Sequence, residues 1–504
     1  YNFKKIMINF NNYKKIYILI FISIVLHIIF INFYPVNFEY VFYEGNNFIR
    51  EKFNKNIAID FFNQQANTFF FTLILSFFSF LFPFIDNIII GKLISLSSYL
   101  FIGLAIKNFY LLKKNNNKNN KSFIVLILLL VNPLIWVFGY RSTPDLISMS
   151  LALFGFSLFF KNINYNNYLK SNIKSVIIIS IATTIKPIVG IYFLLSIFFL
   201  KLNFNKKSFK DLIIIGICYS IIPGIYFLTV YFNFGFFLFT DYYMEVLSVV
   251  NTYSKYFSNL TLYTSFLLIF LTPIIIGRLF YLLFEMSFKF KILNIFVLII
   301  IYFFSNQYLL LSVEMSFGIF DKIINIISLK GIFGMFSYLF FLITFLEFKK
   351  GLKNLDYTKL KLIFIGFLYL IIVSSSLASQ RYLIVILPMF YFIFGDYYKS
   401  KINLVIVFCL CLPTNIILIG NQYLTGKLSH KIIQKINNKG LIEDVCVGAV
   451  GSHVSHYFNN SDRLAKNCVL KDLHIVNGVN SKALISVEDN FLFINKSYSL
   501  IKVR

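Results

Sequence analysis

The feature that most constrains this chain is a series of apolar runs of roughly 20 residues, separated by short Lys-rich clusters. An α-helix needs a run of about that length to cross the hydrocarbon core of a bilayer. Hydrophobic residues make up 58% of the 504 residues and charged residues only 13%, so a soluble fold could not bury them. The pattern predicts an α-helical polytopic membrane protein with about thirteen transmembrane helices.

The net charge of +26 does not indicate nucleic-acid binding, because the cations lie in clusters between apolar runs and form no continuous basic face. The Lys-rich clusters are assigned to the inner side of the membrane: 1–15, 113–121, 161–174, 201–210, 278–291, 349–361 and 396–401. The other connections hold fewer cations and more acids than these clusters, and are assigned to the outer side: 34–87, 140–145, 186, 232–261, 312–330 and 379–382. The asymmetry follows the positive-inside rule.

Two runs do not fit a simple alternation of sides. Residues 67–85 are expected to form a helix embedded along or partway into the outer leaflet, because 88–112 already supplies the crossing. Residues 175–200 have cationic flanks at both ends and Lys186-Pro187 near the middle. A proline breaks helical hydrogen bonding and a mid-membrane lysine is costly, so a helical hairpin with an outer tip is predicted. A single kinked helix is the alternative.

The remaining spans follow the apolar runs. The first, 16–33, is taken as a retained span and not a removed signal peptide, because it is long and lacks a small-residue cleavage site. The others are 122–139, 145–160, 212–231, 262–285, 292–311, 331–348, 362–378, 383–395 and 402–420.

The C-terminal segment 421–504 differs in composition from the rest. It alternates β-rich runs with turn residues and two candidate helical stretches, which predicts a small α/β soluble domain at the outer face. The membrane domain is therefore 1–420, with a first outer loop at 34–66. Cys446 and Cys468 in the C-terminal segment would be either a disulfide or two thiols.

No motif of a soluble enzyme is present: the sequence has no phosphate-binding glycine loop, no zinc-ligand spacing and no HExxH. His453 and His456, three residues apart, are more typical of a surface turn than of a metal site. No cofactor is predicted with certainty, and a divalent cation is left open.

Polar residues gather instead in the connections assigned to the outer face. The acids are Glu39, Glu44 and Asp145, and the cations are Arg141, Lys186 and Arg381. A carboxylate can act as general base on an acceptor hydroxyl or amine, and cations can neutralise a departing phosphate. This mixture is what a transfer from a lipid phosphate at a membrane surface requires.

The segment FEYVFYEGNNF places an acid, Glu39, shortly before Tyr43 in the first outer loop. This pattern resembles the GT-C superfamily of integral membrane glycosyltransferases, in particular the dolichyl-phosphate-mannose protein mannosyltransferase and aminoarabinose transferase families. Those families often have two adjacent acids. Here the second acid, Glu44, comes five residues later, so either carboxylate is a candidate base. The proline that usually precedes the embedded helix is also absent from DFFNQQANTFFF.

Three later segments add to the resemblance. Asp145 follows a proline-containing span in NPLIWVFGYRSTPD, Lys186 precedes a proline in ATTIKPIVG, and Arg381-Tyr382 open QRYLIVILP. The resemblance implies transfer of a sugar from a polyprenyl-phosphate donor to a lipid, glycan or protein acceptor.

Within this scheme Glu39 is the expected base and Asp145 a supporting acid. Lys186, Arg381 and Arg141 would hold the donor phosphate, and Tyr43 and Tyr382 would line the site. The expected location is a bacterial inner membrane, with the endoplasmic reticulum as the alternative. A glycan polymerase or ligase, or a lipid or polysaccharide transporter or flippase, are the alternative functions.

Overall fold

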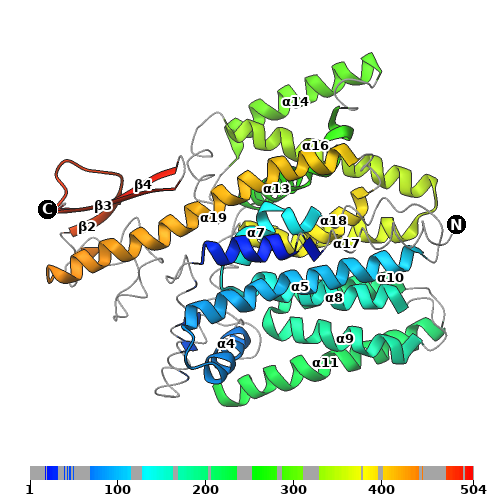
Figure 1. Cartoon of the computed structure of the whole chain (residues 1–504). Coiled ribbons are helices and arrows are strands. Elements are labelled where there is room, and N and C mark those ends of the chain that lie inside the picture. The colour runs from blue at the N-terminus through cyan, green and yellow to red at the C-terminus, as the bar shows by residue number, and fades with distance from the viewer. Residues whose placement is uncertain are drawn as a thin grey trace.

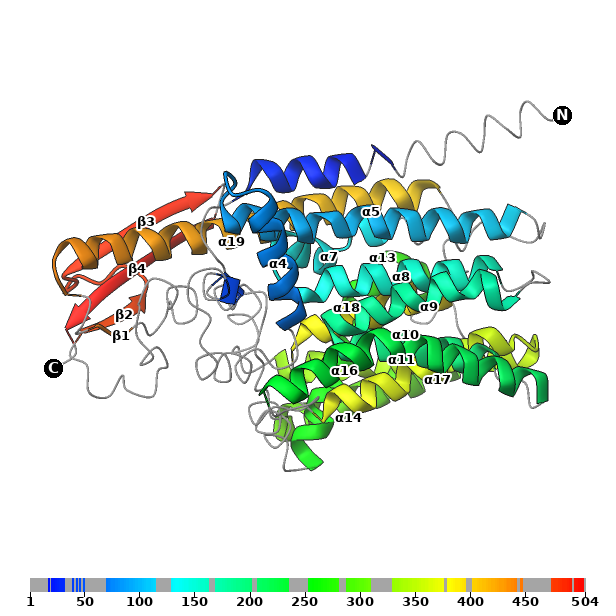
Figure 2. The same ribbon diagram turned by 90° about the horizontal axis from the view of Figure 1, so that it is seen from below.

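A computed structural model gives the arrangement of the chain. It describes residues 17–18, 20–31, 39, 42–43, 45–46, 49, 69–114, 128–162, 168–201, 206–234, 253–280, 287–309, 329–375, 379–395, 401–441, 445–446, 473–491 and 494–502. Figures 1 and 2 show a bundle of long helices, with a small sheet beyond one end of it.

The bundle confirms a polytopic membrane protein. Its helices are α4 (Phe69–Leu81), α5 (Asn87–Lys114), α7 (Pro133–Tyr140), α8 (Pro144–Asn162), α9 (Tyr168–Ile185), α10 (Pro187–Lys201), α11 (Lys206–Phe234), α13 (Tyr253–Phe280), α14 (Phe288–Tyr308), α16 (Leu329–Lys353), α17 (Tyr357–Ser374), α18 (Leu383–Phe394) and α19 (Lys401–Asn438). Among the described residues, six helices are long and apolar enough to cross a membrane, or seven if a bent pair counts as one span. The predicted number of about thirteen crossings is therefore not established.

The helical hairpin predicted at 175–200 is confirmed. Helix α9 ends at Ile185 and α10 begins at Pro187, with Lys186 alone between them. The two helices fold back so closely that a Cβ on Gly190 would overlap with Thr183. A single kinked helix would hold these two residues about 10 Å apart along its axis, so that alternative is wrong.

The helix predicted at 67–85 is present as the shorter α4. In Figure 2 it runs across the direction of α5 and α8 at the end of the bundle nearest the sheet. A crosswise direction is what a helix lying along a leaflet would have, and its depth in the membrane stays a prediction.

The continuous span expected at 122–139 is wrong over its described part. A short 3-10 helix, η1 (Leu128–Val131), is followed by a break at Asn132 and then by the eight-residue α7. The Asn132 side chain accepts a hydrogen bond from the Leu134 N–H and so caps α7, whose first residue is Pro133. Helices α7 and α8 then meet at a bend of 120°. Apolar composition alone did not reveal this capped break.

The other expected spans have helical counterparts. Helices α5, α8, α11, α14, α16, α17 and α18 occupy the runs predicted for them. Helix α13 begins at Tyr253 and not at 262, so part of the expected outer loop 232–261 is helical.

Helix α19 joins the bundle to the C-terminal sheet. It continues for 38 residues from Lys401 to Asn438, about 57 Å, without interruption at the boundary predicted after 420. Figure 1 shows it leaving the bundle and running toward the strands. One continuous helix therefore connects the two regions across the predicted domain boundary.

The sheet itself confirms the predicted α/β character of the C-terminal segment. Its strands are β1 (Val445–Cys446), β2 (Leu473–Asn477), β3 (Ile485–Phe491) and β4 (Ile494–Lys502), in the spatial order β1-β2-β4-β3. The β1–β2 pair is parallel and the others are antiparallel. One face packs on α19, where Leu428, Ile432 and Ile436 form a core with Val487 and Leu500.

Candidate functional site

The first buried charge pair joins Glu39, which precedes α4 in the chain, to the start of α5. Glu39 is fully buried, and its Oε2 lies 3.5 Å from Nζ of Lys92. Its Oε1 accepts a hydrogen bond of 3.0 Å from the Ser142 N–H, in the bend between α7 and α8. Lys92 also donates to the Tyr140 carbonyl at 3.2 Å and lies 4.3 Å from the centre of that ring. The carboxylate is thus held between a cation and a backbone donor.

Tyr43 closes the same corner of the site. Its hydroxyl donates a 2.5 Å hydrogen bond to Oγ of Ser142. Helix α5 comes close here because it has a glycine: a Cβ on Gly91 would lie 2.8 Å from Ser142 Oγ and 3.1 Å from Tyr43 Oη. The first loop, α5 and the α7–α8 bend therefore meet at one point.

The second charge pair lies three residues further along the bend. Asp145 stands in the first turn of α8, where the helix dipole favours a negative charge, and forms an ion pair with Lys186 at the hairpin tip. Both side chains are nearly buried, with 11% of Lys186 and 5% of Asp145 exposed. A buried lysine is tolerated in a membrane protein when it has such a partner.

Arg381 and Tyr382, which directly precede α18, complete the part of the site around the Asp145–Lys186 pair. The Tyr382 ring has the ammonium of Lys186 5.4 Å from its centre and the guanidinium carbon of Arg381 5.3 Å from it. Arg381 also interacts electrostatically with the carboxylate of Asp145. Segments far apart in the sequence thus bring two cations to one aromatic ring and a carboxylate to those cations.

Arg141 faces another partner. Its Nε donates a 3.3 Å hydrogen bond to Oε1 of Gln422, on α19. Its guanidinium carbon lies 5.4 Å from the centre of the Phe138 ring. Arg141 therefore connects the bend to the helix that carries the C-terminal sheet.

Seven of the eight predicted site residues thus fall into two groups of contacts that the bend 141–145 joins: Glu39, Tyr43 and Arg141 in one, and Asp145, Lys186, Arg381 and Tyr382 in the other. Glu44 lies outside the described residues. Lys186, which was expected to hold the donor phosphate, already has a counterion within the chain, because Asp145 forms an ion pair with it.

Three residues of the site were not predicted: Lys92, Ser142 and Gln422. Lys92 had a usable signal, since a lysine inside an apolar run was the argument that singled out Lys186. Ser142 contributes a backbone N–H, which any residue type except proline could supply, and an Oγ that accepts from Tyr43, a role that no pattern in the sequence indicates. Gln422 had no signal, because its role depends on where α19 lies.

The described residues contain no group of three or more His, Cys, Asp or Glu side chains that could hold a metal ion. His453, His456 and Cys468 lie outside that part of the chain, as does the Cys446 side chain. A divalent cation and a disulfide both stay predictions.

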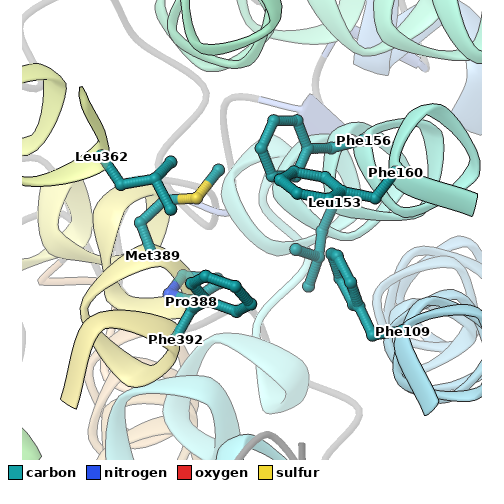
Figure 3. Close-up of a pocket in the computed structure, with 8 residues that line it drawn as sticks. All are labelled: Phe109, Leu153, Phe156, Phe160, Leu362, Pro388, Met389 and Phe392. Atoms are coloured by element: carbon teal, nitrogen blue, oxygen red, sulfur yellow. The ribbon is translucent and has the colours of Figure 1, made fainter. Parts of the chain in front are cut away.

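An apolar cavity lies elsewhere in the bundle, between α5, α8, α17 and α18 (Figure 3). Aromatic rings from α5 and α8 face Pro388, Met389 and Phe392 of α18. Its lining residue Phe160 is about 22 Å along α8 from Asp145. Because the described lining residues are all apolar, they offer no group for acid–base chemistry.

No family model matches the chain, and no curated protein does. Two crystal structures of ArnT from Cupriavidus metallidurans match it, each at 11% sequence identity. The match to the apo form covers 89% of this chain and 84% of the ArnT chain, with a TM-score of 0.40. The match to the form bound to undecaprenyl phosphate covers 96% of this chain and 98% of the ArnT chain, with a TM-score of 0.42. ArnT is an aminoarabinose transferase of the GT-C family, which the sequence motifs also resemble. Identity and TM-score at this level do not assign a reaction, so the function is argued from the site residues.

Proposed function

We propose that this protein is a membrane glycosyltransferase that moves a sugar from a polyprenyl-phosphate donor to an acceptor at the outer face of the membrane. The observation that carries the proposal is the pair of buried carboxylate–lysine contacts, Glu39–Lys92 and Asp145–Lys186, joined by the bend 141–145. Buried charges are costly, and within membrane segments such charges often mark functional sites.

The two carboxylates differ in how tightly they are held. Asp145 is in close contact with Lys186, which opposes its protonation and makes it a poor proton acceptor. Glu39 has the looser contact, 3.5 Å from Lys92. We therefore assign the general base to Glu39, which takes a proton from the acceptor as the sugar is transferred, and a supporting role to Asp145.

The cations suit the leaving group. As the bond from the sugar to the phosphate oxygen breaks, negative charge grows on the phosphate. Lys186 and Arg381, which flank the Tyr382 ring, would stabilise that charge from fixed positions, and Arg141 of the bend would bind the same phosphate. The Tyr43 hydroxyl and the Lys92 ammonium would keep the opposite side of the site in place.

The test is sugar transfer in vesicles that contain purified protein, with and without a polyprenyl-phosphate sugar. Glu39→Gln should lower the rate by about 10²–10⁴. Glu347→Gln is the matched control, because it neutralises a buried carboxylate that is ion-paired with Lys359 and belongs to neither of the two proposed contacts.

If Glu39→Gln stays active while Glu44→Gln or Asp145→Asn is inactive, the base is reassigned to that residue. If no carboxylate variant loses activity, the transferase proposal fails. Movement of the lipid across the vesicle membrane without sugar transfer would favour a transporter.

A further inference from the structure

The C-terminal sheet touches α19 next to the residue that binds Arg141. Gly420 lies two residues before Gln422, and a Cβ on this glycine would overlap with the ring of Phe491, at the end of β3. The Phe491 ring also stands edge-on to Phe30, which directly follows the helix Ile20–Ile29, with 5.2 Å between ring centres. Phe491 therefore lies between α19 and the end of the helix Ile20–Ile29, at the point where α19 leaves the bundle.

Further contacts hold the sheet along the same helix. Lys496 of β4 donates to Oγ1 of Thr425, less than one turn beyond Gln422. Asp489 of β3 pairs with Lys427 at 2.8 Å and with Lys431 at 3.0 Å. Since α19 is continuous here, the position of the sheet and that of Gln422 are mechanically connected.

Gln422 in turn determines how Arg141 is oriented. A guanidinium is planar, so a hydrogen bond at Nε restricts rotation of the plane and sets the direction of its two terminal nitrogens. The next residue, Ser142, donates its N–H to Glu39. A change at Gln422 would therefore act first on the guanidinium, through the hydrogen bond at Nε.

We infer that Gln422 is a positioning residue that orients Arg141 toward the donor phosphate, and that Phe491 holds α19 where Gln422 can do so. The inference rests on the proposed function, in which Arg141 binds that phosphate. The C-terminal sheet then helps to shape the donor site, because it fixes the position of α19 and thereby of Gln422. Changes at Gln422 and Phe491 should alter donor binding more than the rate of the bound complex.

The chain carries a fluorescent probe for this test. Its only tryptophan is Trp136 in α7, five residues before Arg141, which follows the end of that helix. Binding of a polyprenyl phosphate to full-length protein in phosphatidylcholine vesicles is followed by Trp136 fluorescence. Gln422→Leu, which removes the acceptor oxygen at similar size, should weaken binding about tenfold or more. Gln422→Glu, which keeps an acceptor oxygen, should stay within about threefold of the parent.

Phe491→Ala should weaken polyprenyl-phosphate binding as Gln422→Leu does. The double variant should have the same affinity as whichever single variant binds less tightly, because both substitutions act through the Gln422–Arg141 hydrogen bond. Phe491→Leu is the milder second variant, should Phe491→Ala fail to fold. Lys435→Gln, which alters an exposed α19–sheet contact further out, is the control and should bind like the parent. In transfer assays the donor KM should rise in the two affected variants while kcat changes little.

The inference is overturned if Gln422→Leu binds like the parent while Arg141→Ala loses binding. The part that concerns Phe491 is overturned if the losses of binding free energy caused by the Gln422 and Phe491 substitutions add in the double variant. If Arg141→Ala also binds like the parent, the phosphate role of Arg141 in the proposed function is wrong, which is a separate result.

Discussion

Substitutions at the Asp145–Lys186 pair should show separately what the pair contributes to stability and what it contributes to sugar transfer. Lys186→Met leaves the Asp145 carboxylate, 5% exposed, without its ion-pair partner. Breaking a buried pair from one side typically costs about 3–5 kcal/mol of folding free energy. Because Arg381 also interacts with Asp145, we expect the lower end, about 3 kcal/mol. Replacing both partners, in Lys186→Met/Asp145→Leu, should restore most of this stability, since no buried charge is left unpaired.

The measurement is thermal unfolding in detergent micelles, followed by Trp136 fluorescence, beside sugar transfer in vesicles. Lys186→Met should lower the midpoint by several degrees, and the double variant should unfold close to the parent. Both should be inactive, because the phosphate has lost a cation. A Lys186→Met variant as stable as the parent would refute the energetic reasoning. A double variant that transfers sugar would refute the role of the pair in the reaction.

Three further predictions concern other parts of the chain. Gly190→Ala should destabilise the α9–α10 hairpin by about 1–3 kcal/mol or more, seen as a lower unfolding midpoint, because the added methyl overlaps with Thr183. Hydrogen bonds from two lysines of α19 lower the pKa of Asp489 to about 2 from its ordinary value of 3.8. Its contribution to sheet docking should therefore be complete above about pH 4 and be lost as pH falls toward 2, which limited proteolysis at graded pH would detect. Cysteines introduced at 470–480 should be labelled from outside intact cells and those at 115–120 should not; the reverse result would contradict the predicted topology.

The helices were predictable where one physical signal dominates. Long apolar runs mark α5, α11 and α16, and the Lys186-Pro187 pair marks the hairpin tip, because a charge followed by a helix breaker is doubly unfavourable within a continuous membrane helix. The break at Asn132 was not predicted, although Asn-Pro is a capping sequence, because the surrounding residues are as apolar as a span. Composition reports what is buried and not where the backbone turns.

The candidate site was predictable to a similar degree. Charges that a membrane excludes, such as Asp145 and Lys186, point to a site from the sequence alone. Their pairing was not predictable, because it depends on how the α7–α8 bend meets the hairpin tip. Gln422 and Phe491 were beyond sequence reasoning, since an uncharged amide and a phenylalanine are common in such a chain and only the path of α19 gives them a role.

The most direct test of the central claim is a density map of the protein with a bound polyprenyl phosphate. The phosphate should lie within hydrogen-bonding distance of Lys186 and Arg381, with Glu39 across the site from it. A phosphate bound away from both cations, with the two carboxylate–lysine pairs unchanged and out of its reach, would contradict this claim.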